Sequence, residues 1–193
     1  MLHSDIKSRP TYRALEPDLA AAGHLLVVET ATLQPGGLAS LADTFAPVAA
    51  KLHTWLVGEA QAVPGLGKPW HLPAVADVVD ALACATRGYG IGDRLYVQGT
   101  EPFLWSVATA AAIVGFGPGQ LQLCHAGSLQ RRVWCTHCHG FTEQVTTNVV
   151  PCAGCGRHLL VRDHFSRRLG AFMGVMVDAE APGEIPAIEE VFA

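Results

Sequence analysis

Four cysteines in the C-terminal part of the chain form two pairs with the spacing of metal ligands. Cys135 and Cys138 form one C-x-x-C pair, and Cys152 and Cys155 form the second, with 13 residues between the pairs. Each C-x-x-C turn brings two thiolates together, so two such turns on neighbouring hairpins supply the tetrahedron of sulfur ligands that Zn²⁺ accepts. The spacing therefore predicts a zinc ribbon over about residues 131–162.

The same cysteines could also form disulfides, act as a redox-active dithiol or bind iron, and the sequence supports these alternatives to different degrees. The N-terminal segment has no apolar signal core, which indicates a reducing compartment and disfavours disulfides. A redox-active dithiol in one pair is disfavoured by the presence of the second pair. Iron stays open, because two C-x-x-C turns also hold iron in rubredoxin-like electron carriers.

His137 and His139 flank the first pair and are expected to face solvent or to lie beside the metal. Gly156 follows the second pair and is expected to allow a tight turn with positive φ.

Length and composition allow two arrangements of the chain. The 193 residues suffice for one compact domain with a small module, or for two small domains. The hydrophobic fraction of 50% supports a core, and the charged fraction of 16% indicates surface that is buried against partners. The longest apolar run, Val107 to Phe116, is about half of what a membrane span needs. We therefore expect no membrane span and a cytoplasmic location.

The positive charge is concentrated around the cysteines. Residues 131–168 contain six arginines against two acidic residues, whereas the remainder of the chain is acidic. A basic segment can dock on an acidic protein, lie near a phosphate-bearing cofactor or bind nucleic acid. Few aromatic residues are available to stack on bases, which disfavours nucleic acid. We identify Arg162, Arg167 and Arg168 as candidate partner-docking residues, because the planar guanidinium pairs bidentately with carboxylates or phosphates. A solvated helix face is the alternative for these arginines.

Strands and helices alternate before the cysteines. Continuous apolar runs predict buried strands over residues 24–30, 51–58, 94–99 and 120–124. Helical patterns lie between them over residues 38–50, 74–88 and 100–117. Pro47 is expected to end or kink the first helix, and Thr100 and Pro102 mark the start of the third. The alternation predicts an α/β fold, a small parallel sheet with flanking helices. Residues 59–73 are rich in proline and glycine and predict a loop.

The chain divides into four predicted segments. They are an N-terminal arm (1–22), the α/β domain (23–128), the Cys₄ metal ribbon with a following helix (129–177) and an acidic tail (178–193). The helix after the ribbon is predicted over residues 162–175, with Asp163 as its N-cap. The acidic tail contains prolines and is expected to lie extended over a surface.

The turn after the third strand resembles a known nucleotide domain. Gln98-Gly99-Thr100-Glu101-Pro102-Phe103 is similar to the turn in the last βαβ unit of ferredoxin-NADP reductase-type domains, which lies at the nicotinamide end. After the first strand, however, the glycines lack the G-x-G-x-x-G order, Pro35 removes a backbone donor, and Glu29 adds negative charge. We therefore expect a degenerate reductase-like domain that has lost its nucleotide, with no confidently assigned cofactor-binding residue. A generic α/β sheet is the alternative.

The C-terminal stretch resembles a more specific family. The run WCTHCHGFTEQVTTNVVPCAGCGRHLLVRDHFSRRLGAFMGVMVDAE is similar to the small (DmmA-like) subunits of dimethylamine monooxygenase, over about residues 95–180. The resemblance implies a hetero-oligomeric oxidoreductase that uses NADPH and O₂ to convert dimethylamine to methylamine and formaldehyde. It also implies two partners, a reductase subunit with FMN and a [2Fe–2S] cluster and a haem-binding oxygenase subunit.

The sequence of this chain offers no catalytic residues of its own. It contains no haem-attachment motif, no ferredoxin cysteine pattern and no nucleophile elbow. Cys84 and Cys124 are isolated and are expected to be small buried hydrophobic residues. We therefore expect a subunit with a structural and docking role and a Cys₄ zinc site. Two alternatives remain, a rubredoxin-like iron subunit for electron transfer in the same complex and a nucleic-acid-binding zinc-ribbon protein.

Overall fold

The computed structural model describes residues 8–59, 65–85 and 89–193, and the chain divides into two compact units. The first, Tyr12–Gly127, contains helices and a parallel sheet and is called the α/β unit. The second combines Ser128–Ala193 with residues 8–11 and is called the sheet unit.

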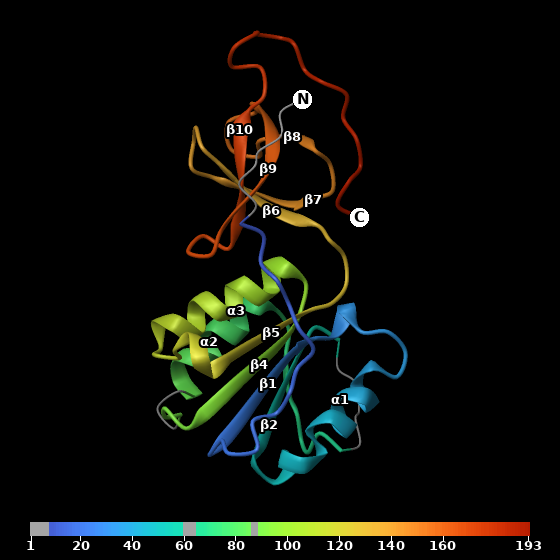
Figure 1. Cartoon of the computed structure of the whole chain (residues 1–193), viewed down its shortest axis with the longest axis vertical. Helices are drawn as coiled ribbons and strands as arrows, with labels where there is room; N and C mark the ends of the chain where they lie inside the picture. Colours follow the sequence, from blue (N-terminus) through green and yellow to red (C-terminus); the bar gives the residue numbers. More distant parts are fainter. Residues whose placement is uncertain (1–7, 60–64, 86–88) are drawn as a thin grey trace. The chain divides into compact units, whose positions relative to one another are not determined.

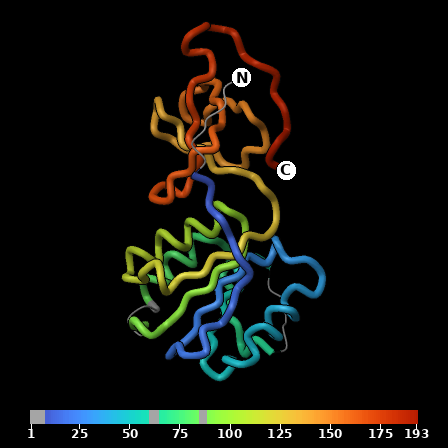
Figure 2. Tube along the Cα trace, in the orientation of Figure 1, coloured from blue at the N-terminus to red at the C-terminus, as the bar shows by residue number. Residues whose placement is uncertain are grey.

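Five parallel strands form the sheet of the α/β unit. Their order is β3-β2-β1-β4-β5, so that β1 lies in the centre, as the chain trace also shows (Figure 2). The strands are β1 (Gly23–Glu29), β2 (Leu52–Val57), β3 (Trp70–Leu72), β4 (Asp93–Gly99) and β5 (Leu121–His125). The predicted α/β class with a small parallel sheet is confirmed.

Helices cover both faces of this sheet (Figure 1). Alternate residues of a strand point to opposite faces, so Leu25 and Val27 join the core under α2 and α3, and Leu26 and Val28 join the core under α1. The α-helices are α1 (Gly37–Phe45), α2 (Val75–Ala85) and α3 (Glu101–Ile113), and the 3₁₀ turns are η1 (Thr30–Thr32), η2 (Ala46–Lys51) and η4 (Pro118–Gln120). The continuous apolar runs of the strands are thus explained by burial on two sides.

The predicted helix boundaries follow their proline and cap residues. The α1 helix ends at Phe45, and Pro47 lies in the 3₁₀ turn that follows. Thr100 occupies the N-cap position of α3, and Pro102 lies in its first turn. The predicted end of the second helix at Gly88 lies outside the described residues. Within the predicted loop 59–73, the structure adds the short strand β3, whose three residues give too little periodicity to be found in the sequence.

The segment 12–22, predicted as part of an arm, packs on the α/β unit. Leu15 and Ala21 are buried. Asp18 accepts a hydrogen bond from Arg94 Nε at 3.0 Å, and the Tyr12 hydroxyl donates to Glu101 at 2.7 Å. These contacts attach the segment to β4 and to the first turn of α3.

His24 gives the α/β unit a pH-dependent stability. The side chain is fully buried in β1, with Nδ1 3.1 Å from the Tyr96 hydroxyl. Burial lowers the pKa of His24, and Lys51 lowers it further. The unfolded chain therefore binds a proton below about pH 6.5 that the folded chain does not, and the free energy of unfolding falls as the pH drops through that value.

We expect His24→Phe to reduce this fall in stability on acidification. The measurement is denaturant unfolding of the α/β unit at pH 7.5 and pH 5.5 for the wild type and the variant. His53→Phe is the matched control, because His53 is exposed and on the neighbouring strand. An equal pH dependence in wild type and His24→Phe would show that His24 is not the titrating group.

The sheet unit contains a five-stranded sheet in which the last strand of the chain is the central one. Their order is β7-β6-β10-β9-β8, with β10 parallel to β6 and antiparallel to β9. The strands are β6 (Arg131–Cys135), β7 (Phe141–Val145), β8 (Val149–Pro151), β9 (His158–Ser166) and β10 (Ala171–Met176). Val133, Leu159 and Phe172 are among the buried residues of its core.

The predicted helix over residues 162–175 is wrong, because this segment is the β9–β10 hairpin. Buried and half-exposed residues alternate along the first part of β9, and Phe172 pairs with Phe165 on one side and with Val133 on the other. Gly170 has a φ of 59° in the connecting turn. Long-range strand pairing thus overrides the local helix propensity of the Arg-Arg-Leu run. Asp163 is not an N-cap, since its carboxylate accepts a hydrogen bond from Arg131.

The acidic tail is extended and adds to the sheet unit. The backbone N–H groups of Val191 and Phe192 donate to the Thr146 carbonyl at 2.8 Å. The Arg131 guanidinium lies between two phenyl rings, 3.8 Å from the Phe172 centroid and 3.7 Å from the Phe192 centroid. Arg131 is 3% exposed and donates to Asp163 at 2.6 Å. The tail therefore covers a buried cation.

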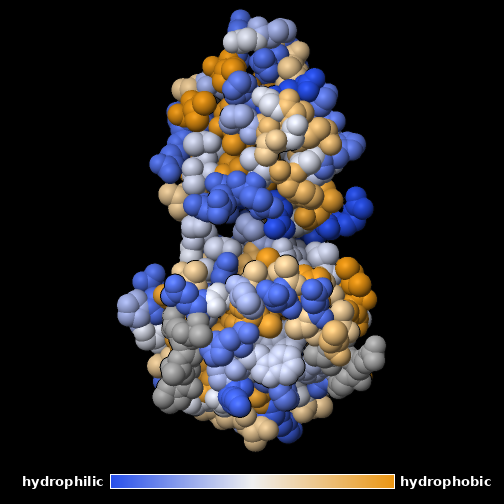
Figure 3. Space-filling view, turned by 180° about the vertical axis from the view of Figure 1, so that it is seen from behind, coloured by the Kyte–Doolittle hydropathy of each residue, from blue (hydrophilic) through white to orange (hydrophobic). Residues whose placement is uncertain are grey.

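Hydrophobic and hydrophilic residues are both exposed on the surface of the protein. The face drawn in Figure 3 carries hydrophobic residues interspersed among hydrophilic ones on each unit. In the described part of the chain, none of the helices has the length and hydropathy that a bilayer crossing requires.

Candidate metal centre

Two turns with the same backbone hydrogen bonds carry the four cysteines. In the turn between β6 and β7, the N–H of Cys135 donates to the Gly140 carbonyl at 2.9 Å, and the N–H of His139 donates to the Cys135 carbonyl at 3.0 Å. In the turn between β8 and β9, Cys152 donates to the Arg157 carbonyl at 2.8 Å, and Gly156 donates to the Cys152 carbonyl at 2.9 Å. Each hairpin therefore presents one C-x-x-C pair in the same local conformation.

The residue after each second cysteine has positive φ. Gly156 has a φ of 72°, which confirms the predicted tight turn, and His139 has a φ of 62° in the equivalent place. A non-glycine residue with positive φ is uncommon. The imidazole of His139 stacks on Trp134, with ring centroids 5.2 Å apart, and this contact fixes the first turn.

The two turns bring all four thiols together, and we call this group the four-thiol cluster. Its sulfur atoms lie within 4.8 Å of one another. Cys135 and Cys155 are separated by 3.9 Å between Sγ atoms, and Cys138 and Cys152 by 3.6 Å. Sulfur ligands about 2.3 Å from a tetrahedral Zn²⁺ stand about 3.8 Å apart. The cluster therefore has the donor set and the size of a tetrahedral metal site.

Backbone donors in the second turn favour the thiolate form. Burial by itself raises the pKa of Cys152, but N–H groups of Cys155 and Gly154 and the neighbouring thiols lower it to about 6. The N–H of Arg157 lowers the pKa of Cys155. Since the thiolate is the metal ligand, these hydrogen bonds prepare the second pair for binding a cation.

Cys138 of the first pair has the opposite tendency to Cys152. The N–H of Gly140 lowers the pKa of Cys138, yet the thiol of Cys152, some desolvation and the thiols of Cys135 and Cys155 outweigh it and raise the pKa to about 11. One thiolate of a close pair thus stabilises the protonated form of the other. Neither His137 nor His139 belongs to the four-thiol cluster.

The three candidate docking arginines lie on the β9–β10 hairpin and not on a helix. Arg167 and Arg168 are exposed in the turn between the strands. Arg162 is half-buried on β9, and its Nε is buried without a hydrogen-bond partner. Asp163 and Glu143 are paired with Arg131 and Arg132, so the segment's own carboxylates are engaged elsewhere.

The crevice at the carboxyl end of the α/β sheet is bridged by the protein itself. The strand order places this crevice between β1 and β4, where doubly wound sheets bind ligands. There the Glu29 carboxylate accepts hydrogen bonds from the Thr100 N–H at 2.7 Å and from the Thr100 hydroxyl at 2.9 Å. A carboxylate therefore stands at the N-terminus of α3, where a nucleotide phosphate would otherwise be favoured.

Sequence reasoning missed the stacking of Arg131 between Phe172 and Phe192, and it missed the exposed Trp70. The contacts of Arg131 join residues far apart in the chain, so no local pattern reveals them. Trp70 lay in a predicted loop, and its pairing with Trp55 comes only from the short strand β3. Of the two remaining cysteines, Cys124 is half-buried as a small hydrophobic residue would be, whereas Cys84 is exposed, contrary to expectation.

The fold and the cluster define a class of protein, an α/β unit joined to a β-sheet module with a Cys₄ metal-type site. Residues 132–175, which include all four cysteines, match the model of the C-terminal domain of DmmA-like subunits of dimethylamine monooxygenase. This segment of the sheet unit is therefore similar to that domain, and the motifs in its sequence predicted the similarity.

A curated protein extends the similarity beyond this module. The chain is 34% identical over 110 residues to the delta subunit of a heme-dependent oxidative N-demethylase from Ectopseudomonas mendocina (strain ymp). The alignment covers 57% of this chain and 63% of that subunit. No solved structure matches the chain significantly.

Proposed function

We propose that this protein is a subunit of a multi-component oxidative N-demethylase. The observation that supports the proposal best is the four-thiol cluster, which lies wholly within the DmmA-like segment. Similarity to the delta subunit of a heme-dependent enzyme points in the same direction. The reaction proposed for the whole complex is the NADPH- and O₂-dependent conversion of dimethylamine to methylamine and formaldehyde. FMN, a [2Fe–2S] cluster and haem are assigned to a reductase subunit and an oxygenase subunit.

We assign a structural role to the four-thiol cluster, with Zn²⁺ held by Cys135, Cys138, Cys152 and Cys155. When bound, the ion supplies cross-linking between two hairpins and no redox chemistry. The side chains of this chain position the ion, and we propose no catalytic residue among them. The bridged crevice at Glu29 and Thr100 agrees with a reductase-like unit that no longer binds nucleotide.

An electron-transfer role is the alternative that the same geometry allows, because four thiolates also hold iron. An iron-loaded chain would show thiolate-to-iron charge-transfer absorption in the visible range. A colourless chain with one zinc ion per molecule would reject this alternative.

The β9–β10 hairpin is the proposed docking element of this subunit. Arg167 and Arg168 are exposed, so an acidic partner can reach both guanidinium groups, and Arg162 lies half-buried on the adjoining strand β9. Because the turn contains no carboxylate between Ser166 and Gly170, its positive charge is available to a partner.

We expect the double substitution Arg167→Glu and Arg168→Glu to weaken assembly with the other subunits at least tenfold, because opposite charges become like charges. The measurement is co-purification from cells that express all subunits, followed by titration of the purified components. Arg9→Glu together with Arg13→Glu is a control with the same charge change outside the hairpin. Unchanged co-purification of the hairpin variant would reject the docking role.

A further inference from the structure

An exposed tryptophan marks the edge of the α/β sheet. Trp70, the first residue of β3, is 59% exposed, which is high for so large an apolar side chain. Trp70 is paired in register with Trp55 of β2. The two indole rings are stacked, with centroids 5.8 Å apart and an angle of 4° between their planes. Since Trp55 is 3% exposed, it anchors Trp70 as a rigid aromatic platform.

A hollow of about 340 Å³ lies against this platform. Both tryptophans line it, and Tyr89 supplies a third aromatic ring. Lys68 and His53 also line the hollow and add polar groups. The volume is at the lower end of the range of small-molecule sites, which is about 300–1,000 Å³. The size therefore suits a ligand with one ring system and a single substituent of the size of a sugar phosphate, and it is small for a dinucleotide.

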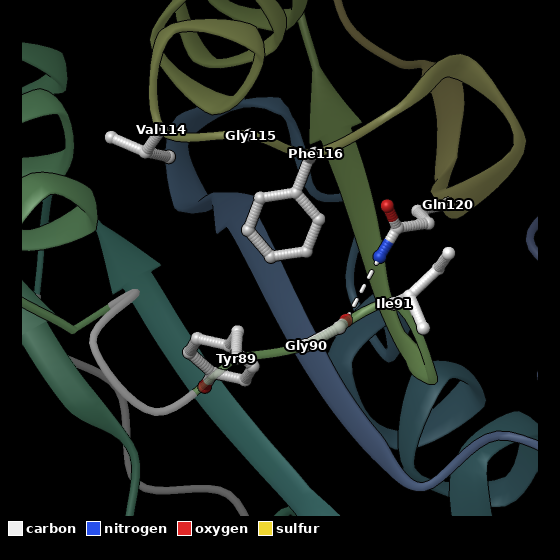
Figure 4. Close-up of a pocket in the computed structure, with 7 residues that line it drawn as sticks. All are labelled: Tyr89, Gly90, Ile91, Val114, Gly115, Phe116 and Gln120. Atoms are coloured by element: carbon white, nitrogen blue, oxygen red, sulfur yellow. Dashed lines mark hydrogen bonds between the residues drawn. The ribbon is translucent and has the colours of Figure 1, made fainter.

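A neighbouring pocket has aromatic rings, Tyr89 and Phe116, but neither the paired tryptophans nor a charged side chain (Figure 4). Its volume is about 220 Å³, and it shares Tyr89 with the first hollow. None of the seven residues drawn is charged. The Gln120 amide donates to the carbonyl groups of Gly90 at 3.0 Å and Asp93 at 3.1 Å, so its nitrogen holds a turn. The second pocket thus offers little to select a ligand.

The chemistry of the first hollow favours a planar anionic molecule. Stacking on indole is open to any flat heteroaromatic ring, since each has a π-face. The Lys68 ammonium attracts a negative substituent. Burial raises the pKa of Tyr89, and Asp93 raises it further, so the phenol stays neutral and does not repel an anion.

We propose that the hollow beside Trp55 and Trp70 binds a planar heteroaromatic ring that carries one anionic group, the chemistry of a mononucleotide. Trp70 stacks on the ring, and Lys68 contacts the anionic group. The site lies beside the amino half of β2, away from the carboxyl-end crevice that Glu29 and Thr100 bridge. It is thus separate from the position where a reductase-type domain would hold its cofactor.

The test is isothermal titration calorimetry of the full chain with adenosine 5′-monophosphate. We expect saturable binding with one site, and weaker binding of uncharged adenosine. Trp70→Ala should weaken binding of both ligands about tenfold or more, because a stacking surface is lost. Lys68→Gln should weaken binding of the monophosphate and leave binding of adenosine unchanged. Added salt should reduce the difference in affinity between the two ligands.

Ile91→Ala is the matched control, since Ile91 is 91% exposed and lines the second pocket but not the first. Its affinity for the monophosphate should equal that of the wild type. Absence of saturable binding would overturn the proposal. An unchanged affinity in folded Trp70→Ala would also overturn it, and loss of subunit co-purification in that variant would then assign Trp70 to a protein interface.

Discussion

Replacing Cys152 by serine is expected to unfold the sheet unit and to leave the α/β unit folded. Cys152 belongs to the four-thiol cluster and has the thiol whose pKa is lowered to about 6. Loss of one thiolate from a Cys₄ site removes most of the metal affinity. Metal binding contributes on the order of 10 kcal/mol to the folding of small metal-bound modules. A five-stranded sheet with a small core cannot replace that contribution.

Elemental analysis and limited proteolysis check this expectation together. The wild-type chain should carry one zinc ion and resist cleavage between β6 and β10. The Cys152→Ser chain should carry no metal and be cleaved in that region, with the α/β unit left as a stable fragment. Cys84→Ser is the matched control, because Cys84 is an exposed thiol outside the cluster. Unaltered protease resistance of Cys152→Ser would show that the sheet unit folds without the cluster.

Arg131→Ala should give the second-largest effect, a loss of about 2–4 kcal/mol in the stability of the sheet unit. The substitution removes a buried cation that contacts the rings of Phe172 and Phe192 and pairs with Asp163. It also leaves a cavity between the rings. Since Asp163 is 43% exposed, its carboxylate is rehydrated after the substitution, which keeps the loss below that of a fully buried pair.

Native-state hydrogen exchange read by mass spectrometry locates this loss. Amide protection should fall in β6, β10 and the tail segment around Phe192, and should stay unchanged in the α/β unit. Arg132→Ala is the matched control, because Arg132 makes an exposed ion pair with Glu143 whose removal costs less than about 1 kcal/mol. Equal amide protection in the Arg131 and Arg132 variants would contradict a stabilising role for the contacts of Arg131 with Phe172 and Phe192.

Features with strong local chemistry could be predicted from the sequence. Two C-x-x-C pairs have few uses, and the structure places Cys135, Cys138, Cys152 and Cys155 in one cluster, as their spacing predicted. The parallel sheet was also predictable, because a strand buried on both faces reads as a continuous apolar run, as in residues 24–30. Thr100 and Pro102 marked the start of α3, although the Thr100 hydroxyl donates to Glu29 and does not cap the helix.

Features that depend on distant contacts were not predictable. Residues 162–175 contain helix-forming residues, and pairing with both β6 and β9 makes the second half of this segment a strand. Arg131 looked like one of six similar arginines until Phe172 and Phe192 were placed on either side of it. The bridge between Glu29 and Thr100 likewise joins the ends of two strands that the sequence separates. Only the sign of Glu29's charge was foreseen.

The central position of β10 fixes the order in which the sheet unit can be completed. The β6–β7 and β8–β9 hairpins each present one cysteine pair, and in the sheet they are joined only through β10, which lies between them. During synthesis both hairpins leave the ribosome before β10 does, so a metal ion held by the four thiols would be able to join them before β10 pairs with either. The last strand would then pair with two hairpins that the bound ion already holds together. Metal supply during translation would therefore govern the yield of folded protein, which pulse-labelled synthesis with and without a zinc chelator can measure.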